Sequence, residues 1–194
     1  MAGRAVFFYG SLRDPELLSV VLGRPRSRIA LTPARLPDHA LRQVAGENFP
    51  CVVEAPGEAA PGDLARDLTE AEVARVLFFE DDEEYALRPL SVLAPDGPVE
   101  ALVCFPKGPT TPAGPWRFED WPAADRELLI ECAHEIMQLH AQGTDWSDLS
   151  LWPGLKARAA ARARAGRAPS AAFPGVDFAR DGVRTEKLAR PYAS

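Results

Sequence analysis

The chain has 194 residues, enough for one domain with its own core, and its 46% hydrophobic and 26% charged residues are close to the globular average. The net charge of −6 argues against nucleic acid as the main partner, because phosphate binding needs a basic field. Three widely spaced cysteines without CxxC spacing indicate neither a disulfide framework nor a zinc site. Because no long apolar run is present, we expect a soluble cytoplasmic protein without membrane contact.

The first elements predicted are a strand, a loop and a well-marked helix. Residues 6–9 favour a strand and residues 10–13 a loop. Asp14 can cap the following helix, Pro15 suits its first position, and Gly23 can end it. Four apolar residues share one face of this helix and should point to the core: Leu17, Leu18, Val21 and Leu22.

The middle of the chain is predicted to be mostly β-structure with one helix. Residues 30–53 indicate short strands interrupted by prolines, and residues 56–62 are rich in turn formers, so we expect a link there. Thr69 and Glu72 have the spacing of a capping box and predict a helix to about residue 79. Two strands joined by a turn follow, at residues 87–93 and 99–105.

The last part of the chain changes to helical character. Residues 106–115 are typical of a linker, and residues 122–142 show the longest helical periodicity. Residues 155–165 should form a helix by propensity. Its basic residues favour a solvated helix face, with an anion-binding or partner surface as the alternative. These residues are Lys156, Arg158, Arg162, Arg164 and Arg167.

The loop that follows the first strand is the first candidate for chemistry. Gly10 allows a tight turn, after which the backbone N–H groups of Ser11, Leu12 and Arg13 can converge on one anion. The start of the next helix adds positive potential. Such a site suits a carboxylate or a developing oxyanion. A plain turn between a strand and a helix is the alternative, and these residues alone leave both interpretations open.

The second candidate is Glu80, at the end of a predicted helix. The helix dipole, the acidic residues 81–84 and the apolar Phe78 and Phe79 would all raise the pKa of its carboxyl group. A glutamic acid that titrates near neutrality is suited to general acid/base catalysis. The alternative is that this acidic run forms a solvated surface turn, and the spacing alone favours that alternative.

Several segments, in order, resemble the γ-glutamylcyclotransferase-like (AIG2-like) family over about residues 5–107. Phe7-Phe8-Tyr9-Gly10-Ser11-Leu12-Arg13 is similar to its opening strand and YGSL loop, and Leu77-Phe78-Phe79-Glu80-Asp81 to its LDxFEG segment. The other similar pieces are Pro61–Leu64, Leu68–Glu72, Tyr85, Arg88, Val92 and Ala101–Phe105. Phe78 stands where the family usually has Asp and Asp81 where it often has Gly, which affects the expected shape of the pocket.

The resemblance implies an α+β fold, a small mixed β-barrel with flanking helices and a C-terminal helical extension. We expect the barrel domain at residues 1–108 and the extension, packed on the barrel, at residues 109–194. The resemblance further implies that the loop holds a γ-glutamyl group and that Glu80 is the general acid/base. The loop residues are Tyr9, Gly10, Ser11 and Leu12.

The implied activity is cyclisation of a γ-glutamyl amide or peptide to 5-oxoproline, with release of an amine or amino acid and without a metal ion or other cofactor. Arg13 or Arg88 would pair with the substrate α-carboxylate, and Asn48 would lie near the site. The expected partner is this small-molecule substrate, and the extension would serve a homodimer or a separate partner. A non-catalytic binding or interaction module on the same fold is the alternative function.

Overall fold

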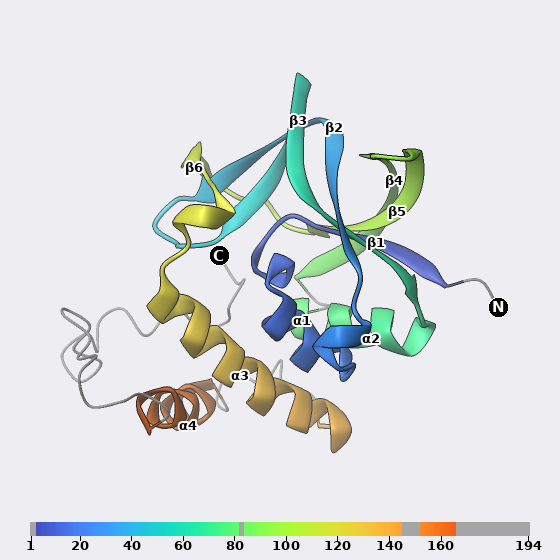
Figure 1. The fold of residues 1–194 in the computed structure, drawn as a ribbon. Helices are drawn as coiled ribbons and strands as arrows, with labels where there is room; N and C mark the ends of the chain where they lie inside the picture. Colours follow the sequence, from blue (N-terminus) through green and yellow to red (C-terminus); the bar gives the residue numbers. More distant parts are fainter. Residues whose placement is uncertain (1–2, 82–83, 145–151, 166–194) are drawn as a thin grey trace.

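The computed structural model describes residues 3–81, 84–144 and 152–165, and these ranges form a barrel with helices along one side (Figure 1). One sheet has the strand order β3-β1-β5-β4-β2-β6, and a further pairing of β3 with β2 closes five of its strands into a barrel. The β1–β5 pair is parallel and the other pairs are antiparallel, so the barrel is mixed. The strands are β1 (Arg4–Phe8), β2 (Leu31–Val44), β3 (Pro50–Leu68), β4 (Tyr85–Ala94), β5 (Gly97–Pro106) and β6 (Pro112–Pro115).

The helices lie together below the barrel in the view of Figure 1. Helix α1 contacts both α2 and α3, and α4 packs on α3. The helices are α1 (Pro15–Leu22), α2 (Glu70–Glu80), α3 (Ala123–Ala141) and α4 (Trp152–Ala165), with 3₁₀ turns η1 (Ser11–Arg13), η2 (Arg26–Arg28) and η3 (Phe118–Asp120). None of the helices in the described ranges is both long and apolar enough to span a bilayer. The α+β barrel that the sequence resemblance implies is confirmed.

The ends of α1 and α2 follow the signals in the sequence. The Asp14 carboxylate accepts hydrogen bonds from the backbone N–H groups of Glu16 and Leu17 at 2.9 and 3.0 Å, and Gly23 ends α1 with a φ of 68°. At α2, Thr69 and Glu72 form both bonds of a capping box. Local side-chain chemistry therefore fixes where both helices begin, and α2 ends at Glu80.

Strands β2 and β3 form one long hairpin, and the turn-rich link predicted at residues 56–62 is wrong. Their pairing runs from Leu31 with Ala65 to Gln43 with Pro50, with an irregularity in the middle where residues 55–58 lie opposite Asp38. The Gly57 N–H donates to the Asp38 carboxylate at 2.9 Å there. Antiparallel ladders leave alternate N–H groups unpaired, so prolines fit at such positions and at bulges.

Two further segments differ from the prediction. The expected linker at residues 106–115 contains β6, in which Pro112 pairs with Val44 and Pro115 with Arg42 of β2. Helix α4 begins at Trp152 instead of residue 155. The predicted extension also includes residues 145–151 and 166–194, which lie outside the described residues. The division at residue 108 stays a prediction.

The apolar core has two parts, and β1 separates them. Val6 and Phe8 pack with the helices, whereas Phe7 and Tyr9 pack inside the barrel. This alternation follows from the two-residue period of a strand. Because both cores meet at the end of β1, the chain that follows Phe8 is held between them.

Helix α4 is tied to α3 by ion pairs, and the two arginines that form them keep side-chain exposures of 59% and 42%, so the basic face is solvated there as predicted. Arg158 and Arg162 both bind the buried carboxylate of Glu135, and Arg162 also reaches Glu131 at 2.7 Å. Burial acts to raise the pKa of Glu135, but the hydrogen bonds from these arginines outweigh it and lower the pKa. Arg164 is exposed, and Arg167 lies outside the described residues.

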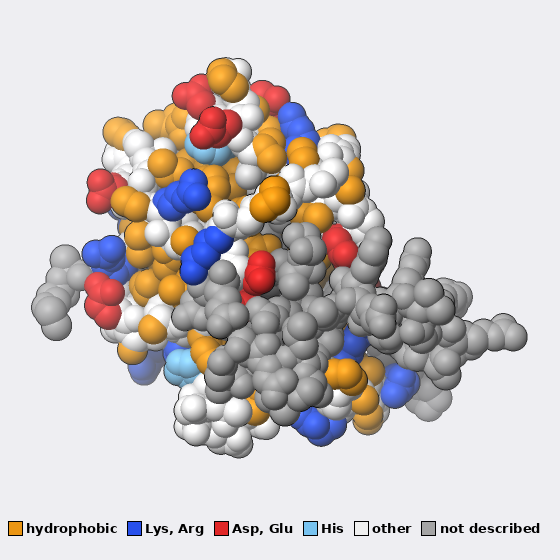
Figure 2. Space-filling view, turned by 180° about the vertical axis from the view of Figure 1, so that it is seen from behind, with side chains coloured by type: hydrophobic (Ala, Val, Ile, Leu, Met, Phe, Trp, Pro, Cys, Tyr) orange, Lys and Arg blue, Asp and Glu red, His pale blue; other side chains and the backbone are white. Residues whose placement is uncertain are grey.

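Seen from behind, the described surface mixes hydrophobic and charged side chains (Figure 2). Leu93, 47% exposed, is the one exposed large hydrophobic residue in the described part of the chain. The rest of the apolar surface therefore comes from small or half-buried side chains. The homodimer suggested from the sequence stays a prediction.

Substitution of Gly62 by alanine is expected to destabilise the barrel by about 3 kcal/mol. A Cβ atom at Gly62 would lie 2.4 Å from Cζ of Phe7 and 2.5 Å from the backbone oxygen of Phe8, so β1 and β3 would have to separate. Denaturant unfolding measures the loss. Gly114→Ala, where a Cβ meets no atom within 4 Å, is the control and should change stability by less than about 0.5 kcal/mol. Equal stability of the two variants would contradict the packing described here.

Candidate active site

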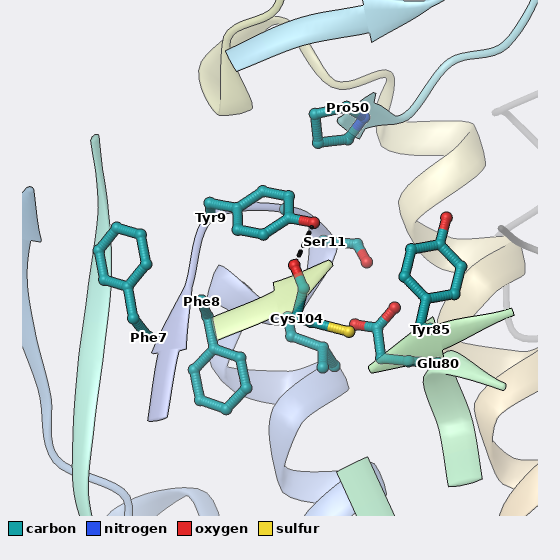
Figure 3. Close-up of a pocket in the computed structure, with 10 residues that line it drawn as sticks. Phe7, Phe8, Tyr9, Ser11, Pro50, Glu80, Tyr85 and Cys104 are labelled. Atoms are coloured by element: carbon teal, nitrogen blue, oxygen red, sulfur yellow. Dashed lines mark hydrogen bonds between the residues drawn. The ribbon is translucent and has the colours of Figure 1, made fainter. Parts of the chain in front are cut away.

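A pocket lies where β1 ends, between the two parts of the core (Figure 3). It brings together the loop at residues 9–12 and Glu80, the two candidates found in the sequence. Chain segments that are distant in sequence complete its wall through Pro50, Tyr85 and Cys104. The full lining is Phe7, Phe8, Tyr9, Gly10, Ser11, Leu12, Pro50, Glu80, Tyr85 and Cys104.

The loop is shaped by the 3₁₀ turn η1. The Arg13 N–H donates to the Gly10 carbonyl at 3.1 Å, so this amide is used inside the turn. Ser11 and Leu12 lie at the start of the turn, and both line the pocket. A Cβ at Gly10 would meet Pro50 Cγ at 3.4 Å, an ordinary contact. Glycine is therefore not needed at position 10 to avoid a clash. The absence of a side chain leaves this side of the pocket open.

Tyr9 connects the loop to the opposite wall of the pocket. Its hydroxyl donates a hydrogen bond of 2.9 Å to the backbone carbonyl of Cys104 in β5, drawn as a dashed line in Figure 3. Tyr9 is itself buried, with 8% of its surface exposed. Its side chain therefore holds the loop in register with β5 and forms part of the wall.

Glu80 lies at the last position of α2 and faces the pocket. Its side chain is half-buried and lines the pocket. Among the described residues, no hydrogen bond or ion pair to its carboxyl group is found. Loss of water around the carboxyl group raises the pKa of Glu80 from 4.5 to about 8. A solvated surface turn therefore does not describe Glu80.

The titratable neighbours of Glu80 are held in their neutral forms. Burial, and next the charge of Glu80, raise the pKa of Tyr85 far above its ordinary value. The same two causes, in the same order, raise the pKa of the Cys104 thiol. A carboxylate at Glu80 would therefore be the first negative charge to form in this pocket.

The pocket is small in this conformation. The volume open to the centre of a water molecule is about 20 Å³, which is room for about one water. Pro50, packed over Gly10, forms one side of it. A ligand of several heavy atoms can therefore enter only when a wall residue moves.

The comparison with known proteins decides the family. The family model described as "Gamma-glutamyl cyclotransferase, AIG2-like" matches residues 6–122. The chain belongs to this family. AIG2-like protein B of Arabidopsis thaliana is 27% identical over 151 residues, which cover 75% of this chain and 86% of that protein.

Two solved structures have a fold similar to that of this chain. An Arabidopsis thaliana protein determined in solution gives a TM-score of 0.51 at 24% identity, over 71% of this chain and 92% of the other. A structure of a gamma-glutamyl cyclotransferase gives 0.50 at 13% identity, over 96% and 97%. At these identities the two structures show a shared fold alone.

The two departures from the gamma-glutamyl cyclotransferase pattern leave Glu80 at the pocket. Phe78 packs edge-on against His140 of α3, with ring centres 4.8 Å apart, and is not part of the pocket lining. Asp81 has a φ of 74°, a conformation that glycine adopts most easily and that Asp and Asn tolerate better than other residues. The backbone at residue 81 thus keeps a conformation suited to the glycine of the family pattern.

Three polar residues suggested from the sequence do not reach the pocket lining. Arg13 binds Asp63 at 2.8 Å and lies over the ring of Phe118. The Asn48 amide donates to the Asp125 carboxylate at 2.9 Å. Arg88 lies over the ring of Phe105, 5.0 Å from its centre. Their predicted contacts with substrate stay predictions.

Two of the lining residues, Tyr85 and Cys104, have no site role predicted from the sequence. Pro50 belongs to the segment Asn48-Phe49-Pro50, which resembles the family's segment near the pocket. One signal was available for Cys104: it alternates with two apolar residues of β5 whose side chains fill the barrel, Val103 and Phe105. A strand period of two therefore directs Cys104 to the other face.

Arg13 is expected to hold the loop in place through its ion pair with Asp63. The Arg13–Asp63 pair is largely buried, with side-chain exposures of 15% and 16%. Arg13→Ala and Asp63→Ala should each lower stability by about 2 kcal/mol, and the double variant should cost little more than either alone. Denaturant unfolding of the four proteins measures this coupling. An increase in KM for Arg13→Ala without any such increase for Asp63→Ala would instead assign Arg13 to the substrate.

Proposed function

We propose that this protein is a γ-glutamyl cyclotransferase-like enzyme that converts a γ-glutamyl amide or peptide to 5-oxoproline and releases an amine or amino acid. The observation that carries the proposal is that one pocket is lined by both Glu80 and the loop at residues 9–12. Membership in the gamma-glutamyl cyclotransferase, AIG2-like family supports it.

The chemistry requires one proton carrier and one set of hydrogen-bond donors. The substrate α-amino nitrogen attacks the γ-carbonyl carbon, a five-membered ring closes, and the bond from this carbon to the leaving nitrogen breaks. Because the nucleophile and the carbonyl belong to one molecule, proximity supplies part of the acceleration. Glu80 accepts the proton of the attacking ammonium group and returns it to the leaving nitrogen.

The loop at the start of η1 serves the second requirement. When the γ-carbonyl is attacked, negative charge develops on its oxygen. The backbone N–H groups of Ser11 and Leu12 are the donors proposed for this oxyanion, because both residues line the same pocket as Glu80. Most of the lining is apolar, and low-dielectric surroundings strengthen such hydrogen bonds.

The raised pKa of Glu80 fits the proposed role. Its value of about 8 is close to that of an ordinary α-amino group, also about 8. Proton transfer between two groups of similar pKa costs little free energy in either direction. A carboxylate with an ordinary pKa of about 4.3 would be a poor base for the ammonium group.

The direct test is release of 5-oxoproline from a panel of γ-glutamyl amides, dipeptides and peptides, followed by mass spectrometry at pH 7 to 9. The proposal predicts turnover of at least one compound. The leaving groups that are accepted then define the substrate class. Folded protein that releases no 5-oxoproline from any compound, while calorimetry detects binding of one of them, would instead support a non-catalytic binding module.

A further inference from the structure

Cys104 is held at a fixed place in the pocket wall. It lies in β5 opposite Leu87 of β4, and the Tyr9 hydroxyl bonds to its backbone carbonyl at 2.9 Å. Its neighbours Val103 and Phe105 point into the barrel, so the Cys104 side chain points to the pocket. In Figure 3 its sulfur atom and the Glu80 carboxyl group face each other.

The Cys104 thiol lies beside the Glu80 carboxyl group, but no hydrogen bond joins them. Among the described residues, no donor to the Glu80 carboxyl group is found, although the thiol lies beside it. A thiol is a weak hydrogen-bond donor, whereas a hydroxyl of similar size is a strong one. The residue type at position 104 therefore determines whether the carboxylate is stabilised from this side.

We propose that Cys104 is a positioning residue for Glu80: its thiol closes the pocket against the carboxyl group without binding it strongly, so the carboxyl group stays directed at the substrate. The inference rests on the proposed function of Glu80. A hydroxyl at this position would donate to the carboxylate, favour its charged form and turn one oxygen away from the substrate. The raised pKa of Cys104, caused by burial and then by Glu80, agrees with a thiol that stays neutral in this place.

The other groups around Glu80 do not supply the same control. Tyr85 of β4 is the other titratable side chain beside the carboxyl group, and burial raises its pKa as well. Tyr9 directs its hydroxyl to the Cys104 carbonyl, and the turn η1 contributes Ser11 and Leu12. The described lining contains no Lys, Arg or His. Replacing the sulfur atom at position 104 by oxygen therefore changes the surroundings of the Glu80 carboxyl group most directly.

The test is a carbon-13 NMR titration of the Glu80 carboxyl group in four proteins, with the signal assigned by its absence in Glu80→Gln. Cys104→Ser is expected to lower the pKa of Glu80 by about one unit or more, a tenfold or larger change in its acid dissociation constant. Cys104→Ala should leave it within about half a unit of wild type. Cys132→Ser, at a buried cysteine of α3 outside the pocket lining, is the matched control and should change nothing.

Two results would overturn the inference. One is an unchanged Glu80 pKa in Cys104→Ser. The other is an equal decrease in Cys104→Ser and Cys104→Ala, because entry of water, and not a hydroxyl bond, would then be the cause. If Cys104→Ser does not fold, Cys104→Thr supplies the same hydroxyl on a residue that suits a strand and is expected to give the same shift.

The activity readout separates this inference from the proposed function. If the enzyme releases 5-oxoproline, the ascending limb of its pH–rate profile should move to lower pH in Cys104→Ser by the amount seen in the titration. If the wild-type protein releases none, the proposed function fails, but the titration still decides whether Cys104 controls the ionisation of Glu80.

Discussion

Replacement of Glu80 by glutamine is expected to lower the rate of 5-oxoproline release by about 10²- to 10⁴-fold. Glutamine has nearly the same shape and fills the same place at the end of α2, but it cannot accept and return a proton. Since Glu80 is mostly neutral at pH 7, with a pKa of about 8, the substitution removes little charge from the pocket. The loss should therefore fall on kcat, with KM changed much less.

Glu70→Gln is a matched control for this experiment. Glu70 lies in the same helix, at its other end, with its side chain 78% exposed and outside the pocket. This variant should keep wild-type kcat within about twofold. A Glu80→Gln enzyme that retains more than about a tenth of wild-type kcat would show that another group transfers the proton.

The second large effect is on stability as a function of pH. The Glu80 carboxyl group has a pKa of about 8 in the folded protein and about 4.5 when unfolded. Between these values the folded state keeps a proton that the unfolded state has lost, so stability falls as pH rises. Below pH 4.5 this cost is absent, and above pH 8 it is complete, at about 5 kcal/mol.

Comparison of wild type with Glu80→Gln isolates this effect from other titrating groups. Burial lowers the pKa of His140 below 6.5, which makes stability rise with pH in part of the same range. That contribution is common to both proteins and cancels in the difference. Chemical unfolding from pH 5 to pH 9 should show little difference at pH 5 and a variant several kcal/mol more stable at pH 9. A constant difference across this range would mean that Glu80 titrates normally.

The helical part of the fold could be predicted because its signals are local. Asp14 and Pro15 begin α1, and the pair Thr69 and Glu72 begins α2, through bonds between residues a few positions apart. The long hairpin of β2 and β3 could not be predicted in the same way. Its prolines were interpreted as breaks, but the pairing of distant residues and the bulge opposite Asp38 accommodate them.

The residues of the candidate site also differ in how far they could be predicted from local sequence. Tyr9 to Leu12 and Glu80 were found because they belong to motifs, and the barrel brings both to one pocket. The contacts of Arg13 with Asp63 and of Asn48 with Asp125 join residues far apart in the chain. Spacing in the sequence holds no information about such contacts. For Cys104 it indicates the face of β5 on which the thiol lies, but not that the thiol faces Glu80.

The role of the two parts of the pocket is tested most directly by binding of the product. In an NMR titration with 5-oxoproline, the amide signals of Ser11 and Leu12 and the carboxyl carbon of Glu80 should shift together with a single dissociation constant. Glu80→Gln should keep the amide shifts, because the loop is unchanged. In the wild-type protein, shifts of the loop amides without a shift of the Glu80 carboxyl carbon would contradict a shared γ-glutamyl site. Shifts at neither place would contradict it as well.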